Sequence, residues 1–200
     1  MKRRVLALIC ATIMAVGTLA GCGNAQEQTE TASETASETE EQATGLANPW
    51  VTTTEEDANA NCYRLFKAPE GATNVEWMKC EALGDEEKGI GPLLQLSFNL
   101  DGVEFTARAQ YGAAEDTDIA GNFVEWTVGP EDTTLANWGE GHMQGKLYRS
   151  INESGYLDMI TWYDIEIGIS YSLTAAAADL EGFDIQAVAE QMYQEMTEEW

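Results

Sequence analysis

The strongest constraint on the fold is the pair Asp101-Gly102, which stands between two stretches of alternating apolar residues. In residues 93–100 and 103–111, every second residue is apolar, as in strands with one buried face. Asp-Gly favours a two-residue hairpin turn, because both turn positions need a positive φ. We therefore expect an antiparallel hairpin whose shared apolar face carries Leu94, Leu96, Phe98, Leu100, Val103, Phe105, Ala107 and Ala109.

Further strands are expected on both sides of this hairpin. Short runs rich in β-branched and aromatic residues are bounded by Gly, Pro, Asn and Asp, which is typical of strands joined by turns. Two of the runs, residues 63–68 and 75–82, are joined by a link containing Pro69 and Gly71, so we expect them to pair as a hairpin. The other expected strands are residues 123–128, ended by Gly129-Pro130, the hairpin 146–151 and 156–163, and residues 166–173.

One helix is expected near the C-terminus. Asp184 is a short acceptor just before a run of helical period, so it is a plausible N-cap. The apolar residues of that run share one helical face: Ile185, Val188, Ala189, Met192 and Met196. The expected class is α+β, with a largely antiparallel meander sheet and a C-terminal helix packed on one face, in a single domain spanning residues 46–200.

The first 21 residues have the layout of a cleaved signal peptide. Lys2, Arg3 and Arg4 precede the apolar stretch 5–16, and small residues follow. The apolar stretch is shorter than the about 20 residues that span a bilayer.

The sequence Leu19-Ala20-Gly21-Cys22 resembles the lipobox of bacterial lipoproteins. The resemblance implies that Cys22 receives a diacylglycerol on its sulfur and becomes the first residue of the mature chain. Several acyl chains anchor a protein stably, so the expected location is the cell membrane, lipid-anchored and facing the extracytoplasmic side. The alternative is an ordinary signal peptide in which Cys22 stands by chance.

Residues 22–45 are expected to form an extended linker that carries the lipid. The stretch is rich in Glu, Thr and Ser and contains no aromatic residue, so it cannot bury enough area to fold. Cleavage would remove three positive charges and lower the formal net charge of the chain from −25 to −28. This excess of acids argues against a nucleic-acid partner, and an anionic lipid surface would repel the domain without the lipid.

The C-terminal region resembles small extracytoplasmic domains of Gram-positive lipoproteins and anti-sigma-factor tails. The resemblance rests on residues 160–164, 169–173 and 183–192, which read as a Trp-bearing strand, a strand ending Tyr-x-Leu and a closing helix. It covers about the last 40 residues and implies a fold rather than an activity.

Cys62 and Cys80 are candidates for a disulfide. They are equidistant from Gly71, so they would face each other in a hairpin centred there, and an exported compartment permits oxidation. The alternative is a pair of free buried thiols. Their wide spacing does not favour a zinc site.

Four aromatic residues are candidates for a sugar- or peptide-binding groove: Trp126, Trp138, Tyr148 and Trp162. Tyr163 and Tyr171 could join them, and the glycine-rich segment 129–145 is expected to be a loop that provides a binding surface. The competing interpretation is that these rings pack in the core.

Other chemistry has weaker support in the sequence. Asp116 and Asp118 could hold calcium, but position 12 of an EF-hand would be Thr127 instead of glutamate, and a solvated acidic loop is the alternative. His142 is the one histidine, and no Gly-x-Ser-x-Gly elbow is present.

No metal or cofactor is expected. The expected function is a non-enzymatic lipoprotein that binds, senses or assembles something at the envelope, with an unknown envelope protein or small ligand as partner. The alternatives are a solute- or glycan-binding module and, less favoured, a hydrolase.

Overall fold

The computed structural model of the protein describes residues 48–195. The expected signal peptide (1–21), Cys22, the linker (22–45) and Met196 lie outside the described residues. No helix within the described part is long and apolar enough to cross a membrane.

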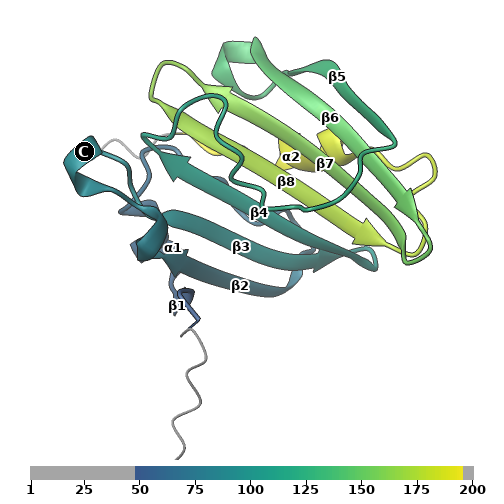
Figure 1. The fold of residues 1–200 in the computed structure, drawn as a ribbon, viewed down its shortest axis with the longest axis horizontal. Helices are drawn as coiled ribbons and strands as arrows, with labels where there is room; N and C mark the ends of the chain where they lie inside the picture. Colours follow the sequence, from purple (N-terminus) through teal and green to yellow (C-terminus); the bar gives the residue numbers. More distant parts are fainter. Residues whose placement is uncertain (1–47, 196–200) are drawn as a thin grey trace, which may run out of the picture. The chain divides into compact units, whose positions relative to one another are not determined.

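The described chain forms one antiparallel sheet in the order β1-β2-β3-β4-β8-β7-β6-β5 (Figure 1). Two four-stranded meanders, β1–β4 and β5–β8, meet where β4 pairs with β8. The protein is thus mostly β, with an antiparallel sheet and a short helix near the C-terminus. This agrees in its main features with the expected α+β class. The strands are β1 (Val51–Thr53), β2 (Thr73–Cys80), β3 (Leu93–Leu100), β4 (Val103–Tyr111), β5 (Val128–Leu135), β6 (Met143–Asn152), β7 (Gly155–Asp164) and β8 (Ile169–Ala177).

The hairpin of β3 and β4 is confirmed. Leu100 pairs with Val103 across the turn, and Asp101 and Gly102 have φ values of 51° and 84°. The positive φ values explain the turn residues, because other side chains are strained in this conformation. The hairpin of β6 and β7 is also confirmed, and β8 lies close to the expected strand 166–173.

One face of the sheet, here called the helical face, carries the main core. It is covered by α2 (Ile185–Gln191) and by the N-terminal segment 54–68, which includes α1 (Glu55–Asn59). Asp184 caps α2 as expected, since its Oδ1 accepts from the amide of Ala187 at 3.1 Å. The apolar side of α2 is buried against the sheet through Ile185, Val188, Ala189 and Met192.

The expected strand 63–68 is wrong. This segment is not a strand but crosses the helical face, where Leu65 and Phe66 are buried and Phe66 stacks on Trp77 at 5.8 Å. Because the side chains of this segment are buried, the segment packs on the face of the sheet instead of pairing at the edge of the sheet. The strand β2 pairs instead with β1 and β3.

The expected disulfide is therefore also wrong, and both cysteines are free buried thiols. Cys62 belongs to the core of the helical face, whereas Cys80 packs with Leu93 and Ile119 in a small cluster on the opposite face. The sheet separates the two sulfurs. Burial raises the pKa of the Cys62 thiol to about 12.

Two further expectations fail around β5. Residues 123–127 are not a strand, and β5 begins at Val128, so Gly129-Pro130 lies inside the strand instead of ending it. A register shift between Val128 and Glu131 accommodates these two residues against β6. The segment 129–145 is consequently mostly strand, with one 3-10 turn (Gly139–Gly141) between β5 and β6.

Candidate functional site

The connection between the two meanders, residues 112–127, crosses the face of the sheet opposite the helices. We call this connection the strap and the face it crosses the open face. Because β4 is central and β5 lies at the edge, the strap must pass over β8, β7 and β6 to join them (Figure 1). It ends on β6, where the amide of Thr127 donates to the carbonyl of Arg149 at 2.8 Å.

Arg108 on β4 anchors the middle of the strap. Its guanidinium donates to the carbonyl oxygens of Ile119 at 3.2 Å and Ala120 at 2.7 Å, and to Oε1 of Gln95 at 2.9 Å. Its Cζ also lies 5.1 Å from the ring centroid of Trp50. Burial lowers the pKa of Arg108, and the nearby Asp118 carboxylate opposes this effect.

Two polar side chains fasten the strap to β8. Nδ2 of Asn122 donates to Oγ1 of Thr174 at 2.9 Å, and the hydroxyl of Ser170 donates to the carbonyl of Ala114 at 3.3 Å. The alternating residues of β8 explain the polar open face, since Ser170, Ser172 and Thr174 point away from the core side of the strand.

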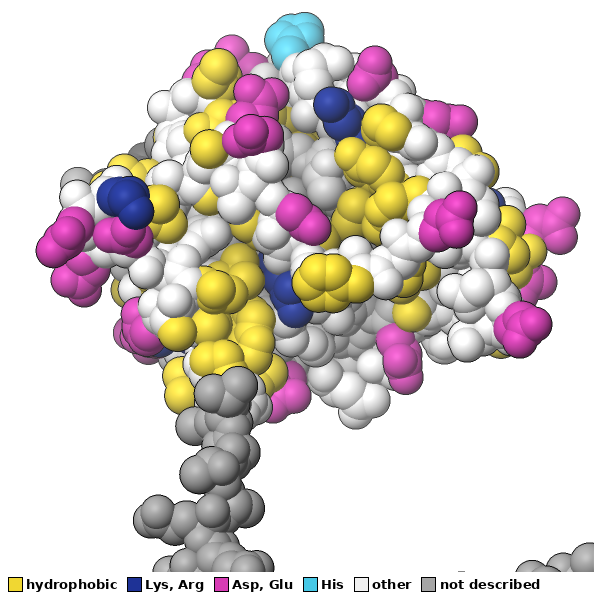
Figure 2. All heavy atoms as spheres, viewed as in Figure 1, with side chains coloured by type: hydrophobic (Ala, Val, Ile, Leu, Met, Phe, Trp, Pro, Cys, Tyr) yellow, Lys and Arg dark blue, Asp and Glu magenta, His cyan; other side chains and the backbone are white. Residues whose placement is uncertain are grey.

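A pocket of about 650 Å³ lies beside the strap, over β6, β7 and β8. Figure 2 shows the hollow on this face, with hydrophobic and acidic side chains around it. Lys146, Thr161 and Ser170 contribute polar groups to its lining, and Trp126, Tyr148 and Met159 contribute apolar surface. The rings of Trp126 and Tyr148 contact each other, with centroids 5.4 Å apart.

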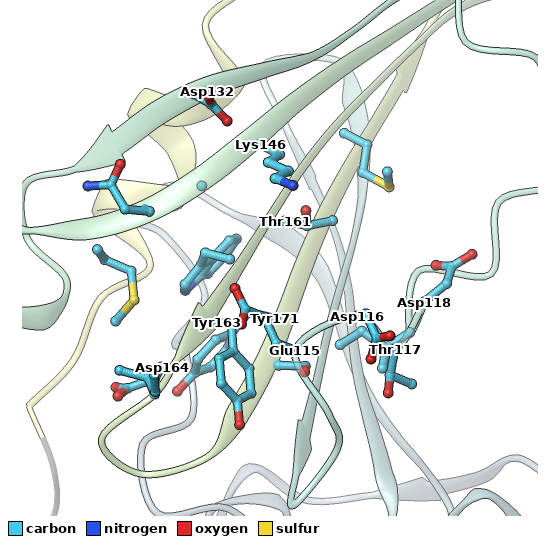
Figure 3. Close-up of a pocket in the computed structure, with 18 of the residues that line it drawn as sticks. Glu115, Asp116, Thr117, Asp118, Asp132, Lys146, Thr161, Tyr163, Asp164 and Tyr171 are labelled. Atoms are coloured by element: carbon cyan, nitrogen blue, oxygen red, sulfur yellow. The ribbon is translucent and has the colours of Figure 1, made fainter.

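The charges around the pocket are unevenly placed. Figure 3 shows Glu115, Asp116 and Asp118 on the strap, apart from Lys146 and Asp132, which come from neighbouring strands. Lys146 makes no ion pair or side-chain hydrogen bond with the residues that the structure describes, although Asp132 is its cross-strand partner. Lys146 is exposed, so the pocket wall carries a solvent-accessible ammonium group that no described acid pairs with, in a strongly acidic protein.

The structure divides the four candidate aromatic residues into two pairs. Trp126 and Tyr148 line the pocket, as does Tyr163. Trp138 packs instead in the core of the helical face, together with the ring of Trp162, whose centroid lies 5.0 Å from that of Trp138. Trp138 is fully buried and donates through Nε1 to the carbonyl of Ala189 at 3.0 Å.

Trp162 borders the pocket, but its ring stacks on Tyr171 within the core at 5.2 Å. This follows from the alternation of β7, which sends Trp162 to the same side as the buried Ile160. Tyr171 is also buried, and burial raises the pKa of its hydroxyl well above the ordinary value.

The two calcium candidates lie at the pocket rim. Asp118 shapes the strap, because its Oδ1 accepts from the amides of Ala120 at 3.0 Å and Gly121 at 3.4 Å. Asp116 is exposed. Among residues 48–195, no three His, Cys, Asp or Glu side chains are grouped so that they could hold a metal ion.

His142 lies at another part of the rim and is exposed. Its imidazole makes no hydrogen bond to a hydroxyl or carboxylate in the described part of the chain. Ser170, the pocket serine, is instead hydrogen-bonded to the strap.

Sequence reasoning missed Arg108, Lys146 and the strap itself. The signal for both side chains was available, since each is a basic residue at an alternate position of a strand in a chain with 10 basic and 35 acidic residues. The path of the strap depends on which strands pair, and local sequence patterns do not predict the pairing of distant strands.

Comparisons of this chain with protein-family models, curated proteins and solved structures found no match.

Proposed function

We propose that this protein is a lipid-anchored extracytoplasmic binding protein that holds a small solute in the pocket of the open face. The observation that carries the proposal is the pocket, whose volume of about 650 Å³ falls within the range of small-molecule sites. Its lining combines the contacting rings of Trp126 and Tyr148 with a few polar groups, which is the usual composition of such sites.

Binding is favoured over hydrolysis because of what the pocket brings together. Rings, hydroxyl groups and an amine can hold and orient a ligand. A hydrolytic site of the serine type needs a hydroxyl that is hydrogen-bonded to a base, and the described hydrogen bonds of Ser170 and His142 do not include this pair.

The anchoring part of the proposal rests on Leu19-Ala20-Gly21-Cys22 and on the linker that follows. The lipid on Cys22 holds the acidic domain at the membrane surface, and the linker holds it away from the anionic headgroups. A tethered domain with an exposed pocket samples solutes outside the cell.

Metabolic labelling with an alkyne fatty acid tests the anchor in a bacterial host. The wild-type protein should incorporate label and fractionate with membranes, and Cys22→Ser should lose both properties. Cys10→Ser is the matched control, since it removes a cysteine that the mature chain does not contain, and its labelling should equal that of wild type. Label retained in Cys22→Ser would refute the anchor.

A thermal-shift panel of neutral sugars, amino acids, short peptides and organic acids tests the pocket. A ligand at 100 times its Kd stabilises the folded state by about 2.7 kcal/mol, which raises the Tm of a domain of this size by about 5–11 °C. At least one class should produce such a shift in wild type and not in Trp126→Ala, which removes a pocket ring.

Phe123→Ala is the control for the panel, because Phe123 is 99% exposed and lies outside the pocket lining. This variant should respond like wild type. A panel in which no class shifts the Tm, or in which Trp126→Ala responds as wild type does, would overturn the binding function.

A further inference from the structure

We infer that the ligand of the pocket is a short zwitterionic peptide of two or three residues with an apolar side chain. This inference rests on the proposed binding function and names the ligand class of the same pocket. It is carried by the placement of opposite charges on two sides of one cavity.

Lys146 is the group that would hold the peptide carboxylate. The ion pairs of the described residues use Arg64, Lys79, Lys88 and Arg149, whereas Lys67, Arg108 and Lys146 take part in none of them. Of these last three cations, Lys146 is the one that lines the pocket. Lys146 lines the pocket beside Thr161, its partner on β7, and no described acid pairs with it. A bound carboxylate would accept from both the ammonium and the hydroxyl group, and bonds of this charged kind are the stronger ones.

The strap provides the site for the peptide ammonium group. Glu115, Asp116 and Asp118 line the pocket from the strap and are exposed to solvent. An ammonium donates three hydrogen bonds, and carboxylates accept them. Asp118 already accepts from two strap amides through Oδ1, and its Oδ2 makes no hydrogen bond to the described residues.

The separation of the two charged sides sets the length of the ligand. Lys146 lies on β6, whereas the strap residues before and after the acids are fastened to β8 through Ser170 and to β4 through Arg108. Two strand spacings separate β6 from β8 and three separate β6 from β4, which is about 10 to 14 Å between backbones, and the side chains on both sides shorten the gap. An extended chain of two or three residues spans about 7–11 Å, whereas a single amino acid spans about 3.5 Å.

Apolar surface lies where the peptide's side chains would be. Tyr148 and Met159 are cross-strand partners on the open face, and Trp126 reaches them from the strap. Rings and a thioether accommodate apolar side chains of varied shape.

Ligands with one sign of charge fit this arrangement less well. An anion would meet the three strap carboxylates, and a cation would meet the ammonium group of Lys146. A neutral sugar would use the rings and leave the ammonium unpaired. A zwitterion of the right length satisfies both sides.

Isothermal titration calorimetry of the purified full chain with matched dipeptides tests the inference. The probes are leucyl-phenylalanine, its N-acetyl form without the ammonium group, its C-terminal amide without the carboxylate, free phenylalanine and methyl β-glucoside. The unmodified dipeptide should bind about tenfold more tightly than either blocked form, as the loss of one charged hydrogen-bonded contact implies.

Variants assign each charge to its residue. Lys146→Met should weaken the dipeptide about tenfold and leave the amide unchanged, because the amide has no carboxylate to lose. Asp116→Asn should weaken the dipeptide and leave the N-acetyl form unchanged. The matched controls Lys67→Met and Glu87→Gln alter exposed charges outside the pocket and should bind like wild type.

Three results would overturn the ligand class. They are blocked forms that bind as tightly as the free dipeptide, a glucoside that binds more tightly, and dipeptide binding that Lys146→Met does not change. Where another solute still shifts the Tm in a Trp126-dependent way, the binding function stands and only the ligand class fails. Absence of binding by every probe and every panel compound overturns both.

Discussion

Replacing Arg108 with methionine should release the strap from the sheet while the sheet stays folded. Methionine keeps most of the length of the side chain but removes the guanidinium. The carbonyl oxygens of Ile119 and Ala120 and the amide of Gln95 then lose the donor that they share.

The magnitude follows from these bonds. A hydrogen bond to a charged group contributes about 1.5–3 kcal/mol when buried, and water can replace part of this where the strap is exposed. We expect the three bonds together to contribute about 3 kcal/mol to the local stability of the strap, which corresponds to an about hundredfold change in its opening equilibrium.

Native-state hydrogen exchange measures this opening directly. The amides of Thr117, Ala120 and Gly121 are hydrogen-bonded within the strap, so their exchange should accelerate about a hundredfold in Arg108→Met. The amide of Leu173 in the central strand β8 should keep its protection, because its bonds do not involve the strap.

Two variants make the result specific. Arg108→Lys keeps a positive charge but not the fork of donors, so its strap amides should show an intermediate acceleration. Lys88→Met removes an exposed cation that pairs with Asp85, away from the strap, and it should exchange like wild type. Unchanged strap protection in Arg108→Met would refute the anchoring role, and equal acceleration in β8 would show that the strap is not a separate unit.

The remaining predictions concern stability and the thiols. Arg149→Met should destabilise the domain by about 3–5 kcal/mol in urea unfolding, because it leaves the buried Asp158 without the guanidinium that donates to it at 2.6 Å, and adding Asp158→Leu should recover most of the loss. Under the proposed cleavage and lipidation at Cys22, the purified mature protein should show two thiols reactive to a disulfide reagent in guanidinium without reductant, and almost none when native, since Cys62 and Cys80 are buried and free. A denatured mature protein without reactive thiols would refute this. Hydrogen bonds from Thr53 and Lys79 hold the pKa of Asp57 below its ordinary value of 3.8, so their stabilising effect should be present above about pH 4 and be lost as the pH falls through the lowered pKa. In Asp57→Asn the unfolding midpoint should therefore depend less on pH over that acid range. A pH profile identical to that of wild type would contradict the assignment.

The parts of the fold that sequence reasoning predicted are those set by neighbouring residues. The turn at Asp101-Gly102 and the cap at Asp184 depend on a few adjacent side chains, and both are confirmed. The β6–β7 hairpin was found for the same reason.

The parts that failed depend on distant partners. An apolar run such as residues 63–68 reads alike whether it pairs as a strand or packs flat on a sheet, and only the position of β1 and β3 beside β2 decides between them. The expected disulfide was wrong for the same reason, because it assumed a hairpin between residues 63–68 and 75–82 that does not form.

The candidate site was half predictable for a similar reason. Alternation with Ile160 would have assigned Trp162 to the core, whereas Trp126 lies in the strap, where no period applies. Lys146 becomes a candidate site residue only because the strap brings Asp116 and Asp118 to the same pocket, and the strap could not be predicted from local patterns.

The pairing of β4 with β8 has a consequence for how the protein folds. Each meander is made of neighbouring hairpins that close short loops, but Ala109 meets Tyr171 only when the two halves of the chain dock. The strap can lie over the second meander only after that step, because it starts on one half and ends on the other. A chain that stalls with its two halves apart would therefore contain most of the hairpins but not the pocket. Ligand binding would report the last step of folding, and a bound ligand would favour that step by mass action.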